Sequence, residues 1–130
     1  MVSNVKLALR EVREPGDVNT ERVFLVATDD VDLGDYIITD TTYGNDGKIS
    51  NKSRHVYEFE PKVIKKGECV ALYTMAGKYL LDTTTGRHPV PLHRFYWGLG
   101  SNIWNKTGDK AFLLYAPRAE RQALVVPESE

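Results

Sequence analysis

The sequence predicts an all-β fold, an antiparallel β-sandwich or barrel, and three observations support this class. The apolar segments of the 130-residue chain are short. They are separated by stretches rich in Gly, Asn and Asp, which favour turns. No amphipathic window has the length of a helix, so the helical crossovers that a parallel sheet needs are missing. Because each sheet must bury one apolar face, short strands of this kind pack as two facing sheets.

The expected strands follow one another along the whole chain. The segment 5–13 begins with Val5, Leu7 and Leu9 on one face and with Lys6 and Arg10 on the other, the period of a half-buried strand. The later segments are near-continuous apolar runs, which suit strands that are covered on both faces. These runs span residues 22–28, 36–39, 69–74 and 111–116, with weaker ones at 55–60 and 122–126. Residues 41–54 carry few apolar anchors and are expected to form a long loop.

Length and composition indicate one domain over residues 1–126, followed by a polar tail at 127–130 that is expected to fray. The single cysteine excludes a disulfide framework. No apolar run has the length of a membrane-spanning helix, and the first residues lack the apolar core of a signal peptide. A soluble chain, cytoplasmic by default and without membrane insertion, is therefore expected.

The net charge of -1 argues against a general nucleic-acid binder, which carries a strong basic excess. The charge is unevenly distributed, since residues 1–60 hold 12 acidic and 7 basic side chains, and residues 61–130 hold 6 and 10. If the two halves occupied different ends of the fold, the molecule could orient a partner or associate with itself. Interleaved strands would average this asymmetry out, and that interpretation is favoured.

The most distinctive segment is RFYWGLGSNIWNKTGDKAFLLYA, residues 94–116. Its Asn-Lys-Thr-Gly-Asp stretch suits a tight turn into the last apolar run, and its two tryptophans are expected to anchor the core. The segment resembles the lamin-tail domain family, and the prokaryotic members in particular. In that family a Trp-Gly pair leads through an Ile-Trp-Asn turn to Gly-Asp and an apolar strand. The matching residues, expected to be structural, are Trp97, Gly98, Ile103, Trp104, Asn105, Gly108 and Asp109.

Residues 21–28, 31–40 and 57–74 also follow the order of the family, so the resemblance covers about residues 5–116. It implies an immunoglobulin-like sandwich that serves as a binding or assembly module without catalytic activity. A fold does not carry a function with it, so the reactive side chains are considered separately.

Candidate catalytic groups are sparse. Cys69 begins an apolar run, where a buried and inert thiol is expected. His55, His88 and His93 show no spacing that places two of them beside a carboxylate ligand. His88 and His93 flank two prolines, which favour an extended edge segment with exposed side chains. No catalytic residue and no cofactor is therefore predicted.

Four aspartates form the only candidate metal site, a calcium-binding turn: Asp29, Asp30, Asp32 and Asp35. Calcium takes six to eight oxygen ligands, and a loop between strands can offer several. Their spacing does not follow the EF-hand pattern, however, and a solvated turn is the favoured interpretation.

Arg87, His88, His93 and Arg94 form a candidate basic binding edge next to Phe95. The predicted function is recognition of a protein partner through this edge, the acidic turn and the 41–54 loop. One alternative is a nucleic-acid-binding accessory domain. Another is an unrecognised hydrolase or metal-dependent enzyme, which would need one of the histidines beside an acidic residue in a cleft.

Overall fold

The computed structural model describes residues 4–43, 49–104 and 110–127, and the side chains of residues 41–54 are not described. Within these ranges the chain forms ten strands and two single-turn 3-10 helices. The strands are β1 Leu7–Arg13, β2 Arg22–Ala27, β3 Val31–Asp32, β4 Tyr36–Tyr43, β5 Ile49–Glu58, β6 Val63–Ile64, β7 Cys69–Tyr73, β8 Leu80–Thr83, β9 Pro91–Tyr96 and β10 Lys110–Tyr115. The 3-10 helices are η1 Leu33–Asp35 and η2 Arg118–Glu120. The predicted all-β class is confirmed.

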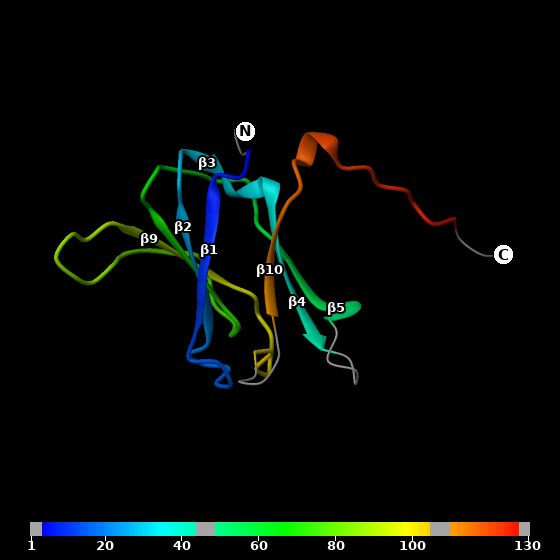
Figure 1. Cartoon of the computed structure of the whole chain (residues 1–130), viewed down its shortest axis with the longest axis horizontal. Coiled ribbons are helices and arrows are strands. Elements are labelled where there is room, and N and C mark those ends of the chain that lie inside the picture. Colours follow the sequence, from blue (N-terminus) through cyan, green and yellow to red (C-terminus); the bar gives the residue numbers. More distant parts are fainter. Residues whose placement is uncertain (1–3, 44–48, 105–109, 128–130) are drawn as a thin grey trace.

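Two sheets face each other as a sandwich, with strand orders β1-β2-β7-β9-β8 and β10-β4-β5, and β3 pairs with β6 at one end (Figure 1). Among the described residues, β7 and β9 are the one pair of strands that run parallel, and the other pairs are antiparallel. After β7 the chain forms β8 two strand positions away and then returns as β9 between β7 and β8. The expectation of a purely antiparallel sheet is therefore wrong at this pair.

The main core lies between the sheets and follows the period of two along each strand. Val23, Leu25 and Ala27 of β2 point inward and are almost fully buried. Across the sandwich they pack with residues of β4 and with large aromatic side chains such as Trp104 and Phe59.

A second apolar cluster covers the outer face of the five-stranded sheet. Cys69, Ala71 and Leu92 are buried there and pack with Phe24 and Val90. Residues Cys69 to Leu72 of β7 are consequently buried on both faces, as a near-continuous apolar run predicts. This outer cluster forms the floor of the groove described below.

The buried carboxylate of Glu21 connects three segments of the chain through hydrogen bonds. Glu21 is fully buried, and its side chain accepts hydrogen bonds from the backbone N–H of Gly16 at 3.0 Å and of Ile103 at 2.9 Å. It also accepts from the Thr74 hydroxyl at 2.6 Å and, more weakly, from the Trp104 N–H at 3.4 Å. These bonds join the turn before β2, the end of β7 and the segment that precedes β10.

The tryptophan segment forms part of the core as expected. Trp104 is buried, and its ring centroid lies 6.4 Å from that of the partly buried Trp97. Gly98 has a φ of +84°, a conformation that favours glycine. Residues Asn105, Gly108 and Asp109 of the motif lie outside the described ranges.

The long loop expected over residues 41–54 is largely a pair of strands. β4 continues to Tyr43 and β5 begins at Ile49, with Thr41 paired to Ser53. Strand pairing is made by backbone groups, so a polar segment can extend a hairpin whose apolar part is already paired. Residues 44–48 between the two strands are not described.

The strand expected over residues 122–126 does not form. Leu124, Val125 and Val126 are almost fully exposed in an extended segment that leaves the sandwich after η2 (Figure 1). Conversely, the proline-containing segment expected at an edge is β9, an internal strand. Pro91 is its first residue, where a missing N–H is tolerated. None of the helices among the described residues has the length and apolarity to cross a bilayer.

Candidate functional site

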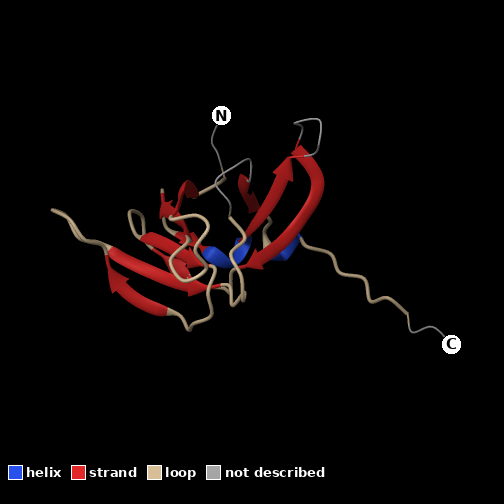
Figure 2. Ribbon diagram, turned by 90° about the horizontal axis from the view of Figure 1, so that it is seen from below, coloured by secondary structure: helices blue, strands red, loops and turns tan. Residues whose placement is uncertain are grey.

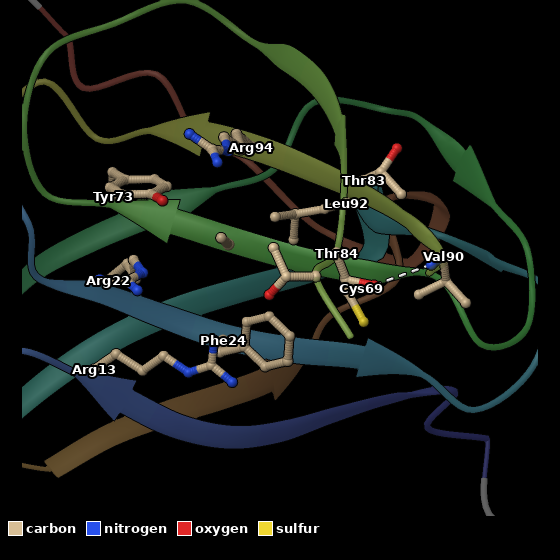
Figure 3. Close-up of a pocket in the computed structure, with 12 residues that line it drawn as sticks. Arg13, Arg22, Phe24, Cys69, Tyr73, Thr83, Thr84, Val90, Leu92 and Arg94 are labelled. Atoms are coloured by element: carbon tan, nitrogen blue, oxygen red, sulfur yellow. Dashed lines mark hydrogen bonds between the residues drawn. The ribbon is translucent and has the colours of Figure 1, made fainter. Parts of the chain in front are cut away.

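A groove of about 500 Å³ lies on the outer face of the five-stranded sheet (Figure 3). We call it the arginine groove, because Arg13, Arg22 and Arg94 line it from strands β1, β2 and β9. Its floor is the outer apolar cluster, and residues 83–85 with Val90 form one wall. The described lining includes no acidic side chain.

The groove follows from strand register. Phe24, Ala71 and Arg94 occupy one row across β2, β7 and β9, and Arg22 lies opposite Tyr73 in the next row. Residues paired across strands point to the same face, so these side chains share the outer surface. Ala71 is small and stands between Phe24 and Arg94, which leaves the hollow.

Aromatic rings hold the three guanidinium groups. The Arg13 guanidinium lies 4.0 Å from the centroid of the Phe24 ring. Those of Arg22 and Arg94 lie 5.7 and 5.6 Å from the centroid of Tyr73. Cation–π contacts of this kind are favourable and restrict the side chains, so the donors are positioned before a ligand arrives.

Each arginine also has an acidic neighbour at the rim. The shortest N–O distances are 2.6 Å from Arg13 to Glu11, 2.5 Å from Arg22 to Glu14 and 2.7 Å from Arg94 to Asp82. Exposed pairs of this kind contribute only about 0–1 kcal/mol. A carboxylate or phosphate that enters the groove can therefore replace these partners at little cost.

One hydrogen-bond donor of Arg94 has no acceptor among the described groups. Its Nε atom is buried and has no hydrogen-bond partner among the described groups. A buried donor without an acceptor is costly, by about 1–3 kcal/mol. The Trp104 indole N–H is a second buried donor without a partner among the described groups, so the Nε atom of Arg94 does not by itself indicate a ligand.

Hydrogen bonds close the loop that forms one wall of the groove. The Cys69 thiol in the floor of the groove is inert. Thr84 donates its backbone N–H to the Val90 carbonyl at 2.9 Å, and its hydroxyl accepts from the Val90 N–H at 3.0 Å (Figure 3). Cys69 is buried as expected, and burial raises the pKa of its thiol. A raised pKa disfavours the thiolate, so the groove offers no activated sulfur nucleophile.

Two histidines do contact acidic side chains, which the sequence did not indicate. His93 is buried rather than exposed, because it lies opposite Val70 on the inner face of the sheet. Its Nε2 atom is 2.9 Å from Glu68, and its Nδ1 atom is 2.8 Å from the Tyr79 hydroxyl.

His55 lies near Asp40, with 3.1 Å between Nδ1 and Oδ2, and donates its backbone N–H to the same carboxylate at 2.7 Å. His88 is exposed in the loop between β8 and β9. None of the three histidines lines the arginine groove or either of the two smaller hollows, one beside Asp30 and Tyr36 and the other beside Tyr57 and Tyr79.

The aspartates of the acidic turn bind protein donors. Asp32 accepts from the backbone N–H of Gly34 at 2.9 Å and of Lys62 at 3.0 Å. Asp30 accepts from the Lys66 N–H at 3.0 Å, and this bond holds the pKa of the Asp30 carboxyl below its usual value.

Asp35 accepts from the Arg118 N–H at 3.0 Å, and Asp29 is exposed. Across the described residues, no three His, Cys, Asp or Glu side chains are placed to hold a metal ion. The turn therefore has a structural explanation in its own hydrogen bonds.

The expected basic edge does not form a single surface. Arg87 and His88 lie in the loop before β9, His93 points into the sandwich, and Arg94 points into the groove. Sequence reasoning did not identify Arg13, Arg22, Phe24 or Tyr73 as site residues. The alternation of side chains along a strand indicates which residues of that strand share a face. No local pattern, however, shows which strands are neighbours in the sheet.

The fold and the groove together define an all-β sandwich with a cationic surface groove on one sheet. No family model, curated protein or solved structure matches the chain. The functional assignment therefore depends on the chemistry of the groove.

Proposed function

We propose that the protein is a non-catalytic binding module of the lamin-tail type whose arginine groove binds an acidic segment of a protein partner. The observation that carries this proposal is the convergence of Arg13, Arg22 and Arg94 on one groove that has no acidic residue in its described lining. The lamin-tail part of this proposal depends on the sequence resemblance of the tryptophan motif, and the all-β sandwich is consistent with it.

Carboxylates suit this groove for a geometric reason. The guanidinium group presents a planar set of donors that matches a carboxylate in two parallel hydrogen bonds. A glutamate or aspartate bound in the groove could pair with the guanidinium group of Arg94, which lines it. The apolar floor at Ala71 and Leu92 would accept an aliphatic side chain of the same segment.

The aromatic rings favour a protein ligand over a nucleic acid. Base stacking requires a free ring face, but Arg13 covers Phe24, and Tyr73 is stacked on Tyr96 with 5.3 Å between centroids. Arg22 and Arg94 flank the Tyr73 ring as well. The rings therefore serve to hold guanidinium groups, and the nucleic-acid alternative becomes an outcome of the test.

The test is a fluorescence-anisotropy titration with short peptides that combine Glu or Asp with Leu, beside matched peptides with Lys in place of the acids. We expect the acidic peptides alone to bind, with affinity that falls as salt is added. Arg94→Gln should weaken binding by about tenfold or more, which corresponds to about 1.4 kcal/mol. Arg87→Gln is the matched control, because Arg87 is exposed outside the groove, and it should change affinity by less than about twofold.

Absence of binding by every acidic peptide, or equal loss in Arg94→Gln and Arg87→Gln, would refute the proposal. A single-stranded oligonucleotide that binds more tightly than the peptides, with the same dependence on Arg94, would instead establish the nucleic-acid alternative.

A further inference from the structure

The segment after η2 has the properties of a strand without a neighbour. Residues 122–127 are extended (Figure 1) and pair with no described strand. Leu124, Val125 and Val126 are 92%, 88% and 82% exposed. Three consecutive exposed aliphatic side chains are unfavourable in water and typically mark an interaction site.

One sheet edge has matching properties. β8 is the last strand of the five-stranded sheet, and no described strand pairs with its outer side. Leu80 and Leu81 in this strand are 49% and 57% exposed. They are neighbours in a strand and point to opposite faces, so β8 presents an apolar side chain on each face of the sheet.

The backbone of β8 offers groups to a new strand. The backbone N–H of Thr84 donates to the Val90 carbonyl across the β8–β9 hairpin. Along an antiparallel strand, residues whose backbone groups face the partner strand alternate with residues whose groups face away. The backbone groups of Leu80 and Asp82 therefore point toward β9. The backbone groups of Leu81 and Thr83 therefore point away from the sheet, and an added strand would pair with these groups.

The other edges of the two larger sheets are less suited to strand addition. β1 has a register shift between Leu9 and Glu11 and charged residues beside it, two features that protect edges. β10 lies in contact with β1. β5 has a mostly polar sequence.

We propose that residues 123–126 of one molecule add as a strand to the free edge of β8 in a second copy. Both segments have four residues. An added strand would place Val125 on one face and Leu124 and Val126 on the other, so that each face of β8 gains an aliphatic neighbour for its leucine. Pro127 lacks an N–H, and pairing ends there.

The acceptor belongs to a second copy because of where the two segments lie. The extended segment leaves one end of the molecule, and the β8–β9 hairpin projects from the other end (Figures 1 and 2). The tail and the edge are different surfaces, so the contact is heterologous and repeats from copy to copy. The arginine groove is not required for it.

The first test is sedimentation velocity of the intact chain over a range of concentrations. We expect concentration-dependent association that is weakened about tenfold or more by Leu124→Asp combined with Val126→Asp. This variant leaves the folded body intact, since both side chains are almost fully exposed. Val56→Asp is the matched control, because Val56 is an aliphatic residue 55% exposed on β5, and it should associate like the unchanged chain.

The second test identifies the acceptor by disulfide trapping between two variants, Leu81→Cys and Val125→Cys. Mixed oxidation should give a cross-linked heterodimer, while Val56→Cys mixed with Val125→Cys should give much less. Cys69 is 7% exposed and is present in both mixtures, so any cross-linking through it affects the two alike. A chain that stays monomeric at all concentrations, association unaffected by the tail substitutions, or equal trapping at Val56 would overturn the proposal.

Discussion

Replacing the buried Glu21 should strongly destabilise the fold. Glu21→Ala removes the acceptor for the backbone N–H of Gly16 and Ile103 and for the hydroxyl of Thr74. These donors would be left without a partner in a site from which water is excluded, since Glu21 is 0% exposed.

The magnitude follows from the number and kind of these bonds. A hydrogen bond to a charged group contributes about 1.5–3 kcal/mol, and a buried donor left without an acceptor costs about 1–3 kcal/mol. Three bonds shorter than 3.1 Å, together with the lost volume, give a loss of about 4–6 kcal/mol. Whole domains are stable by only about 5–15 kcal/mol, so Glu21→Ala should be close to unfolding.

The assay is urea unfolding followed by tryptophan fluorescence, because Trp104 lies beside Glu21. Glu21→Gln keeps the shape and one acceptor oxygen, and should lose about 1–3 kcal/mol. Glu60→Ala, an exposed glutamate, should lose less than about 0.5 kcal/mol. A loss below about 1.5 kcal/mol for Glu21→Ala would refute the argument that this network joins the three segments.

Three further predictions concern other parts of the fold. Burial opposes ionisation of Glu68, but hydrogen bonds with His93 and Lys65 outweigh this effect and lower the pKa of Glu68. The stability of the fold, measured as the urea midpoint, should therefore fall as the pH drops below about 4.5. Gly34→Ala should cost about 1–3 kcal/mol in urea unfolding, because the new Cβ would lie 2.9 Å from Pro61 Cα. The buried Cys69 thiol, with its raised pKa, should react with a disulfide reagent about tenfold or more slowly in the folded than in the unfolded chain.

Each of these has a control. The pKa of Glu68 is lower in the folded chain than in the unfolded chain, so the loss of its proton favours folding. The variant Glu68→Gln should therefore lose less stability between about pH 6 and pH 3.5 than the unchanged chain. An equal loss of stability in both would contradict the assignment of this effect to Glu68. Gly100→Ala meets no atom within 4 Å and should be nearly neutral; a similar loss at both glycines would exclude the Pro61 contact as the cause. Equal thiol reactivity in folded and unfolded protein would show that Cys69 is accessible.

Individual strands were largely predictable from the sequence. The apolar run at 22–28 became β2 over Arg22–Ala27, and the run at 69–74 became β7 over Cys69–Tyr73. Such runs are local patterns, because side chains alternate across the sheet with a period of two and turn residues end each run. β8 was missed since its four residues have no such pattern of their own.

The candidate site was predictable only in part. Arg94 was identified, but as one of four residues on an exposed edge. His93, its neighbour, faces the opposite side of the sheet and is buried. The placement of β9 inside the sheet decided both positions, and that placement depends on pairing with β7 and β8.

The sequence by itself therefore determined the all-β class, most of the strands and the core role of the tryptophans, because these follow from hydrophobic periodicity and turn chemistry between near neighbours. Only the tertiary structure decided the strand order, the parallel pair and the arginine groove. Arg13, Arg22 and Arg94 come together through backbone pairing between distant segments, and no local pattern of side chains specifies which distant strands will pair.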